Sequence, residues 1–242
     1  MNKIVVYFLV VYLLLMPMSL TGCGKNKDDN HAMKEHTTEK AGAFDTYQIQ
    51  TIKDSTSYPG SNIEYPQLIN INNDYATVNQ SLADAVSTQI KNITVNNSVN
   101  TTVNLTYTIT YDKNDLLCVL FEGVISVKEA AHPTNFAFSV CASTVTGELI
   151  NPVTLINMNP GFLTKFKGQL QSQRDNNNRF DPEQWESIAS YIHSFSDADL
   201  NQAICSNATV ALEEGSVLIL FPVSRAVGDY VKISVPLDWR IP

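Results

Sequence analysis

The stretch VNLTYTITY, residues 103–111, decides the fold class, because apolar and polar residues alternate along its whole length. Asparagine or threonine fills every second position. The apolar positions between them are Val103, Leu105, Tyr107, Ile109 and Tyr111. A period of two is the pattern of a β-strand buried on one face. We therefore predict a strand with one face in a core and the other face wet or lightly covered.

Two further strands are predicted directly after this one. Residues 116–127 are apolar on both faces, which is typical of a central strand. Phe136, Phe138 and Val140 mark a third strand, which ends before the turn at Thr146 and Gly147. Since only short connections separate the three strands, they are expected to form an antiparallel meander.

Helical patterns flank this meander on both sides in the sequence. Apolar residues recur at spacings of three and four over residues 75–93, after Asn72 and Asn73, which can cap a helix. Asn159, Asp181 and Ser196 are capping residues for three later helices. A hairpin over residues 209–221 and a strand over residues 231–235 follow. The fold class is therefore α+β, an antiparallel sheet meander with packed helices.

The first 22 residues predict the signal peptide of a bacterial lipoprotein. Residues 4–15, IVVYFLVVYLLL, follow Lys3 and have the length of a signal-peptide core. Residues 20–23, LTGC, resemble a lipobox, which implies that acyl chains such as palmitate are attached to Cys23 after cleavage before it. Two or more acyl chains anchor a protein stably to a membrane. The alternative is an uncleaved signal anchor with an incidental cysteine.

Residues 23–43 predict a disordered tether, because charges of both signs are mixed there without apolar periodicity. His31 and His36 lie in this segment. They could bind a metal only if the tether became ordered, so solvated histidines are the simpler interpretation. We expect the folded part to begin at about residue 44 and to lie on the extracytoplasmic face of the cell membrane.

Composition and motifs exclude several function classes. The net charge is -8, whereas a nucleic-acid-binding surface needs a basic stripe. Motifs for a serine nucleophile, a zinc protease, a phosphate loop or a dinucleotide are absent from the sequence. His132 and His193 fit structural roles, and the pair Glu213–Glu214 fits a soluble turn better than a paired-carboxylate hydrolase. We predict no cofactor, no metal and no nucleic acid as partner.

Three cysteines remain when Cys23 is lipidated. Pairing of the second and third strands about the connection at residues 129–133 places Cys118 opposite Cys141, on the face away from Phe121 and Phe138. This parity permits a disulfide between Cys118 and Cys141. Three buried free thiols, Cys205 included, are an equally acceptable interpretation.

The order of these segments resembles a tandem of two small domains of unknown activity. Such a tandem is found in the extracytoplasmic part of RsiV-type anti-sigma factors and before the catalytic domain of PdaC-type peptidoglycan deacetylases. The matching stretches are EYPQL at residues 64–68, VNQ at 78–80, HP at 132–133, TGE at 146–148 and the run over residues 215–236. The resemblance implies a PdaC-like N-terminal unit at residues 44–143 and an RsiV-like C-terminal unit at residues 144–242.

The resemblance implies a sensor or accessory module rather than a complete signalling protein or enzyme. The sequence shows neither the cytoplasmic domain of an anti-sigma factor nor the Asp-His-His metal site of the deacetylase. In RsiV-type proteins the module is similar to a receptor for lysozyme. We expect a non-enzymatic lipoprotein that binds an envelope ligand such as a basic, lysozyme-like muramidase or peptidoglycan, with no ligand-binding residue assigned. The alternatives are a peptidoglycan-acting enzyme with an unrecognised site and a structural envelope or spore lipoprotein.

Overall fold

The computed structural model describes residues 47–55, 59–71, 74–94, 100–130, 132–174 and 180–237. The predicted lipid-attachment residue Cys23, the tether histidines and the proposed caps Asn72 and Asn73 lie outside the described residues. Residues 44–242 form one compact unit. In the described part of the chain, each helix is too short or too polar to cross a membrane.

Six strands form the larger sheet and follow one another in it in chain order. The strands are β1 (Gln48–Asp54), β2 (Asn62–Ile69), β3 (Thr101–Lys113), β4 (Leu116–Val127), β5 (Thr134–Ser143) and β6 (Leu149–Ile150). Neighbours are antiparallel except β2 and β3, which run parallel and are joined through helix α1 (Ala76–Thr94). The predicted meander of β3, β4 and β5 is confirmed, and β4 is a central strand.

Helix α1 covers one face of this sheet. Its buried residues recur with helical spacing and pack with Leu105, Phe121 and Phe138 of the sheet. The carboxylate of Asp74 accepts a hydrogen bond from the backbone N–H of Ala76 at 2.8 Å and so caps the first turn. The buried helix residues are Val78, Leu82, Val86, Ile90 and Thr94.

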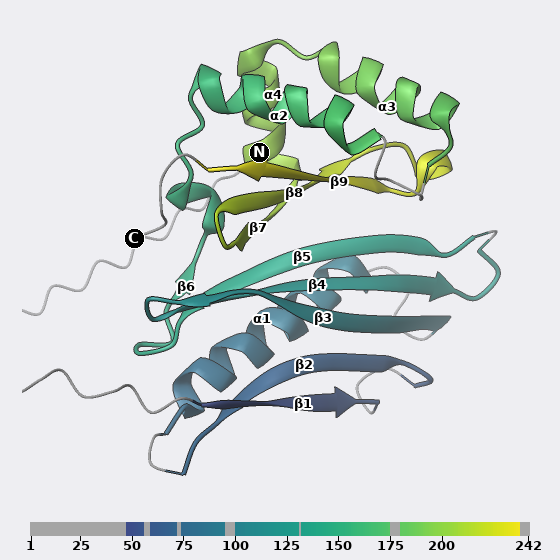
Figure 1. Cartoon of the computed structure of the whole chain (residues 1–242). Coiled ribbons are helices and arrows are strands. Elements are labelled where there is room, and N and C mark those ends of the chain that lie inside the picture. The colour runs from purple at the N-terminus through teal and green to yellow at the C-terminus, as the bar shows by residue number, and fades with distance from the viewer. Residues whose placement is uncertain are drawn as a thin grey trace, which may run out of the picture. The chain divides into compact units, whose positions relative to one another are not determined.

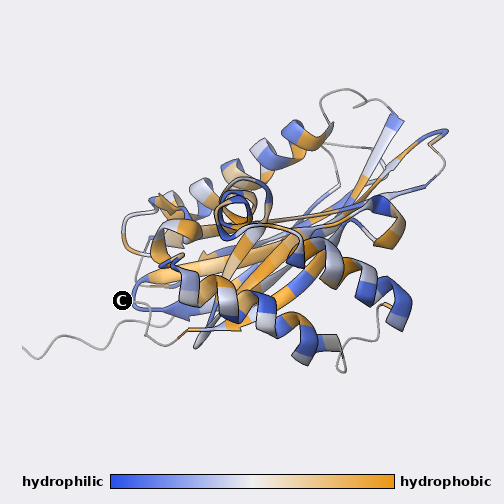
Figure 2. Cartoon of the chain, turned by 90° about the horizontal axis from the view of Figure 1, so that it is seen from above, coloured by the Kyte–Doolittle hydropathy of each residue, from blue (hydrophilic) through white to orange (hydrophobic). Residues whose placement is uncertain are grey.

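The second half of the chain forms a three-stranded sheet covered by helices (Figure 1). Its elements are η2 (Pro152–Leu155), α2 (Pro160–Arg174), α3 (Pro182–His193), α4 (Asp197–Asn207), β7 (Thr209–Glu213), β8 (Ser216–Pro222), η3 (Arg225–Val227) and β9 (Tyr230–Pro236). Strands β7, β8 and β9 pair antiparallel in that order. One face of this sheet and the three helices enclose a core that includes Phe166, Ile192 and Phe221. In Figure 2 hydrophobic strand segments gather at the centre of the view, while the helices alternate hydrophobic and hydrophilic residues, as helices with one buried face do.

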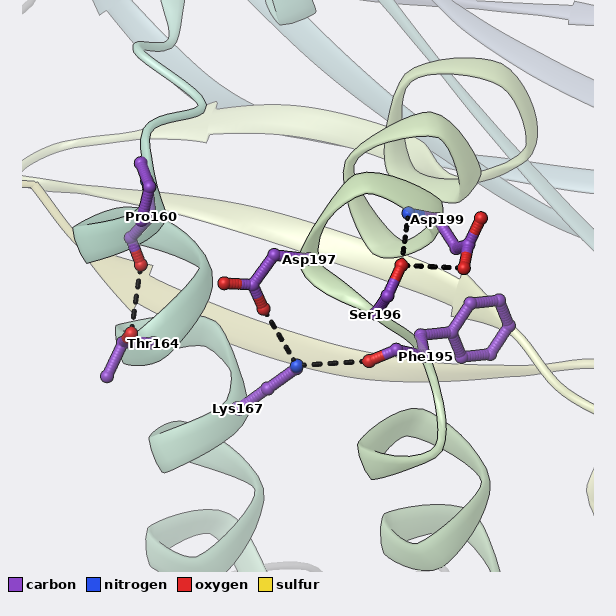
Figure 3. A network of polar contacts seen from close by, with 7 residues as sticks. All are labelled: Pro160, Thr164, Lys167, Phe195, Ser196, Asp197 and Asp199. Carbon is purple, nitrogen blue, oxygen red and sulfur yellow. Dashed lines mark hydrogen bonds and ion pairs between the residues drawn. The ribbon is translucent and has the colours of Figure 1, made fainter.

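The predicted helix caps of this half are confirmed. The Asn159 side chain accepts from Phe162 N–H at 2.9 Å, and Asp181 forms a capping box with Gln184. Ser196 accepts from Asp199 N–H and caps α4. Figure 3 shows how Lys167 of α2 donates to the Phe195 carbonyl and the Asp197 carboxylate at the corner between α3 and α4. The Lys167 contacts link α2 to the corner between α3 and α4.

The two sheets contact each other through both apolar and polar side chains. Leu120 of β4 packs with Ala211 and Leu220 of the smaller sheet. The Glu122 carboxylate accepts from the Tyr230 hydroxyl at 2.8 Å and from the Lys232 ammonium at 2.7 Å. The α+β fold class predicted from the sequence is therefore observed, with strands paired in two separate sheets.

The prediction that residues 103–111 keep one buried face is wrong at Tyr111. The pairing register between β3 and β4 shifts between Ile109 and Tyr111, so a β-bulge inserts one residue. Tyr111 therefore pairs with Cys118 and packs in the core below α2, α3 and α4, while Val103 and Leu105 pack against α1. A bulge leaves the alternating pattern of the sequence unchanged, so the pattern alone could not reveal it.

Candidate functional site

Strand β5 has an edge that is mostly open. On one side it pairs with β4 from Thr134 to Ser143. On the other side, within the described part of the chain, it pairs only with the two-residue strand β6, at Cys141 and Ala142. Backbone groups on that side of residues 134–140 therefore have no neighbouring strand in the sheet.

The direction of these backbone groups follows from strand geometry. Ser143 N–H donates to the Glu148 carbonyl at 2.9 Å, on the β6 side. Since N–H and C=O of alternate residues point to the same side of a strand, those of Asn135, Ala137, Ser139 and Cys141 point the same way. Two contacts agree with this parity, because Asn135 N–H donates to the carboxylate of Asp229 and the Ala137 carbonyl accepts from the hydroxyl of Thr209.

A groove of about 620 Å³ lies along this edge. Residues 137–141 of β5 line it, together with Ala85 and Gln89 of α1. The end of α4 and the start of β7, residues 205–210, line it as well, and residues 149–153 of β6 and η2 complete it. Its volume is within the range of about 300–1,000 Å³ that is typical of ligand pockets.

Among the described residues, those that line the groove include no Asp, Glu, Lys, Arg or His. Its polar groups are amides and hydroxyls, such as those of Gln89, Asn207 and Thr209. Leu149, a lining residue with a half-exposed side chain, adds apolar surface. The lining offers hydrogen bonds and apolar contact to an uncharged ligand.

Two of the cysteines that the sequence singled out, Cys141 and Cys205, line this groove. Cys118 and Cys141 are opposite each other in β4 and β5, as the predicted register requires, and they form a disulfide. Cys141 also lines the groove. Cys205, the free cysteine among the described residues, is exposed and lines the groove too, so it is not the buried thiol of the alternative interpretation.

The other candidate residues are not brought together at the groove. His132 is exposed in the connection before β5, and its carbonyl accepts from Arg225. His193 is exposed at the end of α3. Glu213 accepts from Ser216 and Ser234, and Glu214 pairs with Lys113. Among the described residues, no three His, Cys, Asp or Glu side chains form a metal-binding group.

Among the described residues, Tyr47 and Glu64 have shifted pKa values, and neither lines the groove. Burial of its ring and the hydrogen bond to the Asp112 carboxylate raise the pKa of Tyr47. The hydrogen bonds from Lys53 and Asn62 lower the pKa of the exposed Glu64 carboxyl. Burial and contacts with neighbouring side chains outside the groove explain these shifts.

Two smaller cavities of about 350 and 220 Å³ lie between α1 and the hairpin of β1 and β2. Both are lined by Tyr65 and Ala83. Gln80 and Asp84, which are hydrogen-bonded to each other at 2.9 Å, each line one of them. This region therefore offers an aromatic ring beside amide and carboxylate groups.

The fold and the groove define an α+β protein with a ligand-sized groove at an open sheet edge. No family model matches the chain, and no curated protein matches it. It is similar to the crystal structures of a DUF3298 family protein from Pseudomonas aeruginosa PAO1 and of a DUF3298 family member from Bacteroides fragilis NCTC 9343. Each is 11% identical with a TM-score of 0.43, over 79% of this chain and 91% and 90% of those chains, respectively.

No ligand-binding residue is predicted from the sequence, so the groove is found only in the structure. The groove exists because β6 is only two residues long and leaves most of the other edge of β5 without a neighbouring strand among the described residues. The sequence does indicate that β6 is short. In residues 148–152, ELINP, Pro152 follows the apolar pair Leu149–Ile150 closely, so a strand there must end early. Residues of α1 and α4 line the groove only because the tertiary fold brings them there, and no local sequence pattern predicts this placement.

Proposed function

We propose that this chain is a lipid-anchored, extracytoplasmic module that binds a component of the cell envelope and does not catalyse a reaction. The groove along β5 is the observation that carries the proposal. Its lining provides backbone groups, amides, hydroxyls and apolar surface. Such a lining suits recognition, whereas acid–base catalysis needs titratable groups within hydrogen-bond reach of a substrate.

The disulfide supports an extracytoplasmic location. Cys118 and Cys141 are fully buried and bonded to each other, and stable structural disulfides are typical of oxidising compartments. The proposed anchor is Cys23, as the lipobox resemblance implies. Mass spectrometry of the mature N-terminus tests it, because a chain that begins with acylated Cys23 is expected and an unmodified chain that begins at Met1 would contradict it.

A basic, lysozyme-like muramidase is the leading candidate for the ligand. The net charge of -8 favours encounter with a basic protein. Acidic side chains such as Glu183 and Glu186 of α3 are exposed. Peptidoglycan is the second candidate, which the cavities beside Tyr65 favour, because an aromatic ring with nearby amide and carboxylate groups can contact a sugar on its apolar face and its hydroxyls.

Residues 23–242 carrying Cys23→Ser are expected to be retained on immobilised lysozyme at low salt. Because the attraction depends on net charge, the affinity should fall by about tenfold or more as the salt concentration rises well above 0.1 M. A peptidoglycan column run in parallel tests the second candidate. Failure to be retained on either column at low salt would refute the proposal, and release of soluble muropeptides would favour the enzyme alternative.

A further inference from the structure

We propose that the groove binds an extended, uncharged polypeptide segment, which adds to the larger sheet as a strand beside β5. This inference deepens the proposed function and rests on it for the location of the ligand in the cell envelope. It assigns to the groove a class of ligand, a binding geometry and a set of backbone contacts.

Within the part of the chain that the structure describes, some backbone groups at the edge of β5 have no strand partner, so this edge can pair with an added strand. The contacts of Asp229 and Thr209 occupy the Asn135 N–H and the Ala137 carbonyl, and β6 pairs with Cys141. Between these contacts, the Ala137 N–H and both backbone groups of Ser139 point into the groove. An extended peptide has donors and acceptors at the same repeat and can pair with them.

The space beside the edge of β5, between α1 and β7, suits a single added strand better than a second sheet. An added strand would lie about 4.8 Å from β5. In that position it would be near Ala85 and Gln89 of α1 and near Thr209 and Val210 of β7, which line the same groove. A second copy of this chain would bring its own neighbouring strands and helices into that space. The occupant is therefore an extended segment without a paired neighbour on its outer side.

The residues that line the groove determine which peptide side chains fit in it. Side chains of an added strand alternate between the two faces of the sheet. On the α1 side they would be near Ala85 and Gln89, and on the side of the smaller sheet near Cys205 and Ala208. A charged side chain would lose water there without gaining an oppositely charged partner from the lining. Small, apolar or hydroxyl-bearing side chains fit best.

The variant Ala137→Pro removes one edge donor and is expected to bind such a segment at least tenfold more weakly. Proline is tolerated on an edge strand where the missing N–H faces outward, so the ladder with β4 should persist. Ala137→Ser is the matched control, because it keeps the N–H and nearly the same volume. Circular dichroism and thermal unfolding verify that both variants fold.

The probe is a peptide selected from a random heptapeptide library displayed on phage, with residues 23–242 carrying Cys23→Ser as the target. The selected peptide is then synthesised with each backbone amide methylated in turn. We expect methylation of an amide that donates to β5 to weaken binding at least tenfold and methylation of its two neighbours to have little effect, because only alternate N–H groups face β5. This scan uses the parent protein, so it remains decisive if Ala137→Pro fails to fold.

Chemical modification of Cys205 provides a check on where the peptide binds. A bulky maleimide on this exposed thiol, which lines the groove, is expected to block the peptide. Treating the Cys205→Ser variant with the same maleimide should not change the peptide affinity of that variant, because it has no thiol at this position. Selection of no peptide, a methylation scan without a period of two, or undiminished binding to well-folded Ala137→Pro would overturn the inference.

The lysozyme column separates this inference from the proposed function. Retention that is reduced by Ala137→Pro and by the selected peptide would support both. Peptide binding without retention on either column would support the groove and refute the proposed ligands. Retention that neither the variant nor the peptide affects, in the absence of any selected peptide, would refute the groove and leave the proposed function intact.

Discussion

The double variant Cys118→Ala with Cys141→Ala is expected to lose about 3 kcal/mol of unfolding free energy. The disulfide joins residues 23 apart in sequence, so it restricts a loop of the unfolded chain. Both cysteines are also buried in the core that contains Tyr111 and Leu116, where two alanines would leave unfilled space. Urea denaturation followed by circular dichroism measures the loss.

Two controls accompany this prediction. A reducing agent should destabilise the parent protein by a similar amount and have no effect on the double variant. Cys205→Ser should leave the stability unchanged, because Cys205 is exposed. Residues 23–242 carrying Cys23→Ser should show one reactive thiol under denaturation without reductant. Three reactive thiols, or a double variant as stable as the parent, would contradict the prediction.

The register between β4 and β5 could be predicted from the sequence, because alternate side chains of a strand face the same side and the two strands are close in sequence. The connection after β4 is short, so the pattern around Phe121 and Phe138 determined which residues face each other. The same parity placed Cys118 opposite Cys141. Helix starts were equally local, since Asn159, Asp181 and Ser196 cap the helices that follow them.

Features that depend on distant segments could not be predicted in this way. The bulge before Tyr111 moves this residue into the core that α2, α3 and α4 cover, although its place in the alternation is unchanged. The groove at Ala137 and Ser139 requires β6, α1 and the end of α4 to meet beside β5. Each of these segments has an ordinary local pattern, and only their arrangement creates the groove.

The predicted boundary between residues 143 and 144 coincides with the end of β5, yet buried contacts cross it. Tyr111, Leu116, Cys118 and Cys141, from the predicted first unit, belong to the same core as Trp185 of the second unit. Strand β6 of the second unit pairs with β5 of the first. We propose that the two units share this core and unfold together.

Trp185→Ala is expected to lower the unfolding free energy by about 4 kcal/mol. The indole is 3% exposed, packs against Phe180 and donates to the Leu170 carbonyl at 3.0 Å. Its removal leaves a large cavity and eliminates the hydrogen bond to Leu170. Trp185→Phe is the matched control, because it keeps an aromatic ring and loses the hydrogen bond, for which we expect a smaller cost of about 1–2 kcal/mol.

Calorimetry of these variants tests the shared core, because one cooperative core predicts a single unfolding transition and two independent folding units predict two. If Trp185 and Tyr111 belong to one cooperative core, the parent and Trp185→Ala should each unfold in a single transition, and the variant's should occur at a lower temperature. Circular dichroism and near-ultraviolet tyrosine absorbance should then give the same midpoint. Two transitions, of which Trp185→Ala shifts only one, would instead show that residues 44–143 and 144–242 are independent folding units.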